Sequence, residues 1–299
     1  MTHPPPAEPS RPDVAAPHCY RHGDRETYIS CQRCGRPICP DCMRQAAVGF
    51  QCPECVAEGA RTTPTARTYA GGLVPARVGL VSMVLIGINV VMFILILGTG
   101  GQGSDVSQPS EFYRETFMIG GPFPGRFDGV ADGAYWRLLT AAFVHVQVLH
   151  ILFNMYALTI FGPLLEQLLG RLRFVALYVT GALVSSVAVY WFTSPRVPTI
   201  GASGAIFALF GAAIVLMLRR GQDVSNLLML LGLNLVITFV VPGISWQGHL
   251  GGLVAGLLFG VVFGYAPRRY RTQVQAVAFA AVLAAMVVAT LARTAVLTG

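Results

Sequence analysis

Seven long runs of apolar residues follow one another along the chain from residue 78 onward, separated by short segments except for the long segment at residues 98–148. Most of them approach the roughly 20 residues that an α-helix needs to cross the hydrocarbon core of a bilayer. The runs occupy residues 78–97, 149–169, 172–192, 203–218, 227–241, 249–265 and 274–297. This pattern predicts an all-α polytopic membrane protein with seven transmembrane helices.

Composition supports the same class. Apolar residues make up 54% of the 299 positions and charged residues only 12%, which excludes an ordinary soluble domain. Residues 1–17 are rich in proline and lack an apolar core. They therefore form neither a cleavable signal nor a first span, and we expect a disordered tail.

The arginines predict the orientation in the membrane. They flank alternate connections between the spans, at Arg61, Arg67, Arg77, Arg171, Arg173, Arg219, Arg220, Arg268, Arg269 and Arg271. The positive-inside rule makes that side cytoplasmic, with the N-terminus inside and the C-terminus outside. All 21 basic residues are arginine, which is typical of a GC-rich bacterial genome and suggests a bacterial cell membrane.

All seven cysteines lie near the N-terminus, and together with one histidine they form four closely spaced pairs. The pairs are Cys19 with His22, Cys31 with Cys34, Cys39 with Cys42, and Cys52 with Cys55. Eight ligands suffice for two tetrahedral zinc ions, which predicts two structural zinc ions in a domain at residues 18–56. We expect a linker at residues 57–77 and the membrane domain at residues 78–299. A disulfide framework is the alternative, disfavoured by the odd cysteine count and the cytoplasmic side. His18 is an alternative ligand to His22.

This cysteine-rich segment resembles a B-box or related cross-brace zinc finger. The resemblance implies that Cys19, His22, Cys39 and Cys42 share one ion, and that Cys31, Cys34, Cys52 and Cys55 share the other. Because acidic and basic residues nearly balance in this part of the chain, a nucleic-acid partner is disfavoured and a protein partner or a structural role is expected.

A serine and a histidine begin two of the predicted spans. Ser203 lies in a Gly-Ala-Ser-Gly segment before the fourth span, and His249 begins the sixth. The second, fourth and sixth spans all run from outside to inside, so Ser203, His249 and the polar residues that begin the second span, His150 and Asn154, lie near the external face. A serine and a histidine at the starts of two spans suggest a protease within the bilayer that works by a Ser-His dyad. Small residues for close helix packing are the alternative explanation of the Gly-Ala-Ser-Gly segment.

Glycines recur every four residues along the sixth span, at positions 248, 252, 256, 260 and 264. The fourth span carries Gly204, Ala208 and Ala212 at the same spacing. Such stripes allow two helices to approach closely, which would bring Ser203 toward His249.

Two polar residues of the second span lie on one helical face. His150 and Asn154 are four residues apart, and together with the Ser203 N–H they are candidates for an oxyanion hole. Hydrogen bonding between helices is the alternative, and a metal site at His145 and His150 is a third possibility. Glu166, the carboxylate within a span, lies too far along the helix to complete a triad.

Over about residues 75–270 these features together resemble the rhomboid family of intramembrane serine proteases. The matching motifs are Trp136-Arg137, the segment from His145 to Asn154, Gly162-x-x-x-Glu166-x-x-x-Gly170, the segment from Gly201 through Gly204 to Phe207, and His249-x-x-Gly252-x-x-x-Gly256. The resemblance implies a six-helix core with an added seventh helix, Ser203 as nucleophile, His249 as general base and an oxyanion hole of His150, Asn154 and the Ser203 amide. It also implies that Phe207 packs on His249, that the substrates are single-span membrane proteins and that catalysis needs no cofactor.

The chain departs from this family in two places. Ala134 stands where many relatives have an acidic or amide residue, and the zinc-binding segment is no part of the family pattern. A non-catalytic relative that binds membrane proteins would keep the fold and lose Ser203 or His249. A transporter or channel with a zinc-finger head would carry ionisable residues along a path across the membrane.

Overall fold

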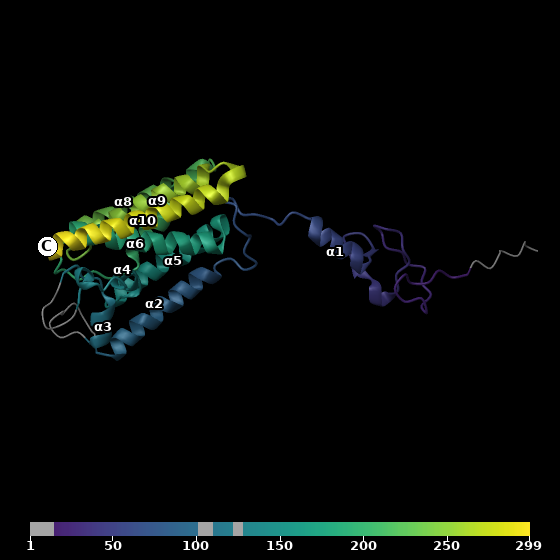
Figure 1. The fold of residues 1–299 in the computed structure, drawn as a ribbon, viewed down its shortest axis with the longest axis horizontal. Helices are drawn as coiled ribbons and strands as arrows, with labels where there is room; N and C mark the ends of the chain where they lie inside the picture. The colour runs from purple at the N-terminus through teal and green to yellow at the C-terminus, as the bar shows by residue number, and fades with distance from the viewer. Residues whose placement is uncertain (1–14, 101–109, 122–127) are drawn as a thin grey trace, which may run out of the picture. The chain divides into compact units, whose positions relative to one another are not determined.

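The computed structural model describes residues 15–100, 110–121 and 128–299, and Figure 1 traces the chain through them. Most of the predicted disordered tail at 1–17 lies outside the described residues. The chain divides into two compact units, Met1–Thr65 and Ala66–Gly299.

The N-terminal unit is small and is built around its cysteines. After the short 3-10 helix η1 (Pro40–Cys42), strands β1 (Arg44–Gln45) and β2 (Phe50–Gln51) pair in antiparallel fashion, and helix α1 (Pro53–Thr62) follows. Its buried cluster consists of the seven cysteines and Ile38. One aliphatic residue is far too little apolar surface to fold a unit of this size, so another source of stability is required.

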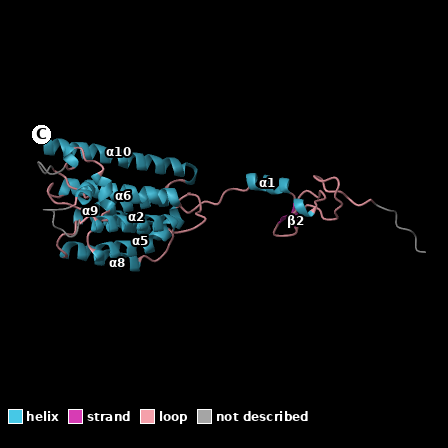
Figure 2. Cartoon of the chain, turned by 90° about the horizontal axis from the view of Figure 1, so that it is seen from below, coloured by secondary structure: helices cyan, strands magenta, loops and turns pink. Residues whose placement is uncertain are grey.

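The second unit is a bundle of helices that confirms the predicted fold class. Its long apolar helices are α2 (Leu80–Gly98), α5 (Val148–Leu169), α6 (Arg171–Phe192), α7 (Ser203–Arg219), α8 (Ser225–Val240), α9 (Trp246–Tyr265) and α10 (Arg271–Thr298). Within the described residues, five helices are long and apolar enough to cross a membrane, whereas α7 and α8 are shorter. In Figure 2 the helices of this unit run side by side, in cyan. Each one coincides with a predicted apolar run to within a few residues.

Helix α7 lies at the centre of the bundle. Twelve of its residues are buried, and it packs on α5, α6 and α9. Its alternation of Gly and Ala with Ile, Leu and Phe leaves room for neighbouring backbones on one side and fills the core on the other. The start of α7, where Ser203 lies, is therefore held by three helices at once.

Part of the predicted linker belongs to these two folded units. Helix α1 continues to Thr62, and residues from Ala66 onward cluster with the membrane unit. The Ala70 N–H donates to the Leu168 carbonyl at 3.0 Å, and Gln275 Nε2 donates to the Ala70 carbonyl at 3.0 Å. The segment before α2 is thus attached to the ends of α5 and α10.

Candidate active site

Ser203 and His249 begin neighbouring helices. Ser203 is the first residue of α7, and His249 lies in the first turn of α9; both are half-buried. Phe207, one turn after Ser203, stacks on the His249 ring with the centroids 4.2 Å apart and the planes 16° apart. Since residues four apart share a helical face, Ser203 faces the same side of α7 as this stacked pair. Among the described residues no hydrogen bond joins the Ser203 hydroxyl to His249, and catalytic hydrogen bonds often tighten only when substrate binds.

The glycine stripe of α9 packs against α7. A Cβ added at Gly252 would lie 2.8 Å from the carbonyl carbon of Gly204, and one added at Gly256 would lie 2.7 Å from the Ala208 Cα. Both distances are shorter than a van der Waals contact between carbon atoms, so a side chain at either position would clash with α7. The backbones of α7 and α9 therefore pack directly against each other at these glycines. The four-residue spacing thus predicts the correct pair of helices and the correct faces.

Of the two predicted oxyanion residues, His150 lies beside the segment that leads into α7. Gly201 has φ +118°, and a Cβ added there would meet the His150 ring at 2.6 Å, so a side chain at this position would displace His150. Asn154 is buried, and its Nδ2 donates to the His150 carbonyl at 2.9 Å. An amide NH2 has two N–H donors, so one remains for another acceptor. The role of His150 and Asn154 in an oxyanion hole stays a prediction.

His145 contacts the backbone just before Ser203. It is fully buried, its Nε2 accepts from the Ala202 N–H at 3.4 Å, and its ring centroid lies 4.8 Å from that of His150. A ring nitrogen that accepts a hydrogen bond is unprotonated, so the neutral His145 carries its proton on Nδ1. This bond fixes the backbone immediately before Ser203.

Trp136 and Arg137 hold the segment between α2 and α5. The buried Arg137 guanidinium donates to the Phe117 carbonyl at 3.1 Å and also reaches the Arg114 carbonyl, and it lies 3.4 Å from a Glu115 carboxylate oxygen. The Trp136 indole N–H donates to the Glu115 carbonyl at 3.1 Å. These bonds join α3 (Glu111–Thr116) to α4 (Arg137–Thr140), so this loop is anchored although Ala134 provides no polar side chain.

Comparison with known proteins decides the family. The family model described as Rhomboid domain matches residues 132–266, which include every candidate residue of this site. YdcA of Bacillus subtilis, named as a candidate rhomboid protease, is 36% identical over 133 residues that cover 43% of this chain and 67% of that protein. The chain belongs to the rhomboid family.

Other rhomboid relatives match over smaller shares of their length. The rhomboid protease GluP of Bacillus subtilis is 31% identical over 57% of this chain and 32% of its own length. RHOMBOID-like protein 5 of Arabidopsis thaliana is 33% identical over 42% of this chain and 43% of its own length. The chain thus spans less than half of these two relatives. It is an integral membrane protein of a family that acts on membrane proteins in the bilayer.

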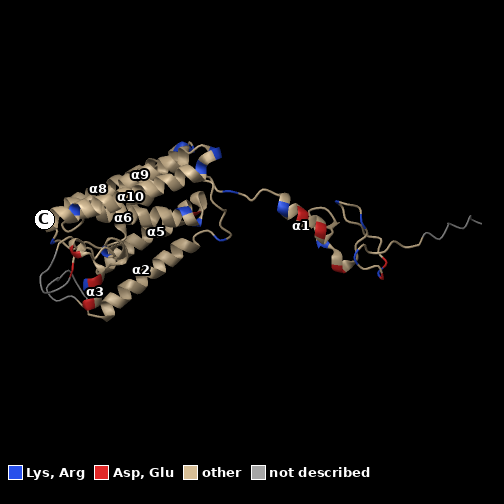
Figure 3. Cartoon of the chain, viewed as in Figure 1, with Lys and Arg blue, Asp and Glu red and all other residues tan. Residues whose placement is uncertain are grey.

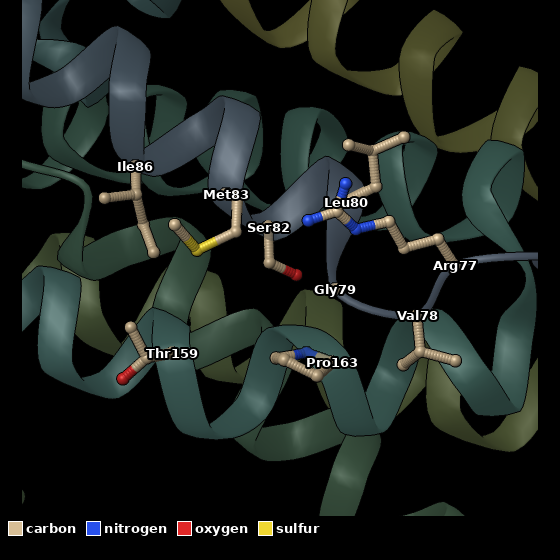
Figure 4. Close-up of a pocket in the computed structure, with 9 residues that line it drawn as sticks. All are labelled: Arg77, Val78, Gly79, Leu80, Ser82, Met83, Ile86, Thr159 and Pro163. Atoms are coloured by element: carbon tan, nitrogen blue, oxygen red, sulfur yellow. The ribbon is translucent and has the colours of Figure 1, made fainter.

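The rhomboid bundle also contains a cavity away from this site. A space of about 250 Å³ lies between the start of α2 and the second half of α5, lined by Arg77, Ser82, Thr159 and Pro163 among others (Figure 4). Thr159 is nine residues beyond His150 on α5, or about 14 Å at 1.5 Å per residue. This cavity therefore does not contribute to the site at the start of α7.

Two groups of metal-ligating side chains lie in the N-terminal unit, and their members are those that the finger resemblance implies. One group is Cys19, His22, Cys39 and Cys42; the other is Cys31, Cys34, Cys52 and Cys55; in each group the ligand atoms lie within 4.8 Å of one another. His18 is exposed and belongs to neither group. All seven cysteines are free thiols in the structure, which argues against the disulfide alternative.

The distances within these groups fit zinc. Four ligands at about 2.3 Å in a tetrahedron place two sulfur atoms roughly 3.8 Å apart. The Cys34 and Cys52 Sγ atoms are 3.8 Å apart, and His22 Nδ1 lies 3.2 Å from Cys39 Sγ and 3.4 Å from Cys42 Sγ.

The Cys19 thiol is prepared for metal binding. Burial opposes its ionisation, but backbone hydrogen bonds from Cys39, Arg21 and His22 outweigh burial and lower the pKa of Cys19 to about 6. A thiolate is the form that binds metal, so the lowered pKa of Cys19 favours this role. In the same group, burial and the neighbouring Cys19 raise the pKa of Cys42 to about 11, so the Cys42 thiol would give up its proton only when a metal binds.

Two residues near the site were not found by the sequence reasoning. Ser185 of α6 lies where a side chain at Gly204 or Gly248 would be, and Thr238 of α8 contacts the His249 ring. Neither residue belongs to one of the rhomboid motifs. A lone hydroxyl in an apolar run is a weak signal, because the run alone does not show which face of the helix is covered.

Proposed function

We propose that this rhomboid protein is an intramembrane serine endopeptidase that cleaves single-span membrane proteins near the external face, with Ser203 as nucleophile and His249 as general base. The observation that supports this most is the stacking of Phe207 on His249, one turn from Ser203, where the α7 and α9 backbones touch. That contact fixes the position of the imidazole relative to the serine helix.

The proposed reaction proceeds in two halves. As Ser203 Oγ attacks the carbonyl carbon of the scissile peptide, its proton passes to His249 Nε2, and the carbonyl π electrons move to oxygen. The C–N bond then breaks, and His249 returns the proton to the departing amine, leaving an ester on Ser203. Water repeats the sequence on the ester, giving up its proton to His249, which returns it to Ser203.

The negative charge that forms on the substrate oxygen when serine attacks must be stabilised by hydrogen-bond donors. The first N–H groups of a helix have no partner within it, so the Ser203 N–H at the start of α7 is available, and the helix dipole favours negative charge there. We assign the other donors to the His150 ring and the free N–H of Asn154. No cofactor enters this chemistry.

The charge distribution supports the proposed orientation. In Figure 3 most of the basic residues of the membrane unit lie at the end opposite the C-terminus, where α6 and α10 begin and α7 ends in Arg219, and fewer lie at the other end. If this end is cytoplasmic, as the positive-inside rule requires, Ser203 and His249 open toward the outside of a bacterial cell membrane.

We assign two structural zinc ions to the two groups of ligands in the N-terminal unit. Metal coordination would supply the folding free energy that one buried isoleucine cannot. The charge balance of this unit favours a protein partner over a nucleic acid.

Two measurements test the proposed activity. The first is labelling with a fluorophosphonate, which reacts with a catalytic serine, and the second is cleavage of a test substrate with one transmembrane helix. Wild-type protein should be labelled and should cleave, whereas Ser203→Ala and His249→Ala should each lower turnover by at least about 10³-fold while the protein stays folded. Undiminished cleavage by a folded Ser203→Ala variant would exclude the assignment. A folded wild-type protein that binds the substrate but neither reacts nor cleaves would instead indicate a non-catalytic relative.

A further inference from the structure

Helix α8 has one buried side chain among its sixteen residues, and that side chain is polar. Thr238 is 3% exposed, whereas its neighbours Ile237 and Phe239 are 42% and 62% exposed. In a bilayer the exposed apolar residues face lipid or other apolar surface at no cost. A buried hydroxyl in this place requires hydrogen-bond partners.

Thr238 has two partners, and together they determine the direction of each bond. Its Oγ1 lies 2.7 Å from the carbonyl oxygen of Asn234 and 2.6 Å from Nδ1 of His249. A hydroxyl carries one proton, and the Asn234 carbonyl can only accept. The Thr238 hydroxyl therefore donates to Asn234 and accepts from the Nδ1–H of His249.

This direction decides which nitrogen of His249 is free. A neutral imidazole has one N–H, so with the proton on Nδ1 the lone pair is on Nε2, the atom that must take the proton of Ser203. Resting on the proposed function, we infer that Thr238 is a positioning residue that holds His249 in the Nδ1–H tautomer and fixes its ring angle. It acts through His249 and does not touch the substrate.

The position of Thr238 also explains how the dyad works without a carboxylate. In the described part of the chain, the His249 ring is held by the Phe207 ring on its face and by the Thr238 hydroxyl at Nδ1. When Nε2 takes the serine proton, the ring becomes a cation and its Nδ1–H bond to Thr238 becomes charge-assisted. A neutral acceptor stabilises this cation less than a carboxylate does, but it sets the same tautomer and orientation.

Two substitutions at Thr238 and a matched control test this role. Thr238→Val keeps the shape and removes the hydroxyl, whereas Thr238→Ser keeps the hydroxyl. Thr290 of α10 is also buried and donates to a carbonyl four residues earlier, at 2.8 Å, but has no histidine partner. Thr290→Val therefore reproduces the loss of a buried, helix-bonded hydroxyl without affecting His249.

We expect Thr238→Val to lower kcat by roughly 10- to 100-fold, the range of one hydrogen bond to a charged group, with little change in KM. Thr238→Ser should recover most of the turnover, and Thr290→Val should resemble the wild type. Equal losses in the Val and Ser variants, or wild-type kcat in Thr238→Val, would overturn the inference.

A second measurement does not depend on activity. In protein labelled with 15N-histidine, the His249 signals, assigned through His249→Ala, should show a protonated Nδ1 and an unprotonated Nε2. This pattern should be lost in Thr238→Val and kept in Thr238→Ser. A protonated Nε2 in the wild type would refute the hydrogen-bond direction. An Nδ1–H wild type without any cleavage would leave the tautomer inference standing and refute the proposed function.

Discussion

In the N-terminal unit the buried cluster consists of seven cysteines and one isoleucine, whereas in the membrane unit it consists of aliphatic, aromatic and small residues from most of the long helices. The N-terminal unit brings eight ligand atoms into two tight groups and has almost no apolar core. The membrane unit obtains its closest contacts where side chains are missing, at Gly252 and Gly256 against the α7 backbone. In the N-terminal unit the closest packing is between metal-ligating side chains, and in the membrane unit it is between helix backbones at glycines.

This difference predicts different responses to the same treatment. Coordination is lost when the metal is removed, while helix packing in a bilayer is insensitive to chelators. Conversely, replacing a glycine at the contact between α7 and α9 by alanine should disturb the helix bundle and leave the metal ligands unchanged. Three experiments follow from this contrast.

Metal removal should have the largest effect, and only on the N-terminal unit. Structural zinc contributes about 10–16 kcal/mol in finger peptides, so stripping the two proposed zinc ions should unfold residues 18–62 completely. Limited proteolysis should then cut this segment while the helices from α2 to α10 stay protected. Metal analysis of untreated protein should find two ions per chain, four ligands each.

Two histidines provide the control for that experiment. His22→Ala should lower the metal content toward one ion, because His22 Nδ1 lies among three sulfur atoms, whereas the exposed His18→Ala should retain both ions. Equal metal content in the two variants would contradict the ligand assignment.

An added methyl group should have an intermediate effect, and only on the membrane unit. Gly256→Ala places a Cβ against Ala208 in the α7 backbone, which should destabilise the bundle by about 1–3 kcal/mol and lower its thermal unfolding temperature. Turnover should fall too, because separating α7 from α9 moves Ser203 away from His249.

Gly87 of α2 is the matched control for Gly256. A Cβ added there meets no atom within 4 Å, so Gly87→Ala should leave stability unchanged or raise it slightly through helix propensity. If both variants unfold at the wild-type temperature, the glycine contact does not contribute to the fold.

The main features of both units can be predicted from the sequence. The length of a bilayer span is a strong physical constraint, so the apolar runs place each long helix to within a few residues, and the four-residue glycine spacing identifies the facing sides of α7 and α9. Ligand spacing likewise identifies the four ligand pairs, whereas their grouping into two sites follows from the resemblance to a cross-brace finger. The structure places His22, and not His18, in one of the two groups.

Contacts made across loops are the part that the sequence does not predict. Thr238 and His249 are separated by the turn between α8 and α9, and the rotation of α8 about its axis is fixed only by packing. The same holds for Ala70, a small residue in a predicted linker whose backbone bonds to α5 and α10. Neither residue type nor spacing indicates such contacts.

Deleting the N-terminal unit should have the smallest effect on turnover. The described residues of this unit, 15–65, include no helix long and apolar enough to cross a membrane, and the unit contains none of the proposed catalytic and oxyanion residues Ser203, His249, His150 and Asn154. The protein shortened by residues 1–65 should therefore cleave a test substrate in detergent at close to the wild-type rate. A deletion of residues 1–77 is the informative contrast, because it also removes Ala70. The Leu168 carbonyl would then lose the Ala70 N–H, and Gln275 Nε2 would lose its acceptor. Buried groups without partners cost about 1–3 kcal/mol each, so the longer deletion should lower the unfolding temperature where the shorter one does not. A folded protein lacking only residues 1–65 that has lost its activity would show instead that the N-terminal unit acts on the site.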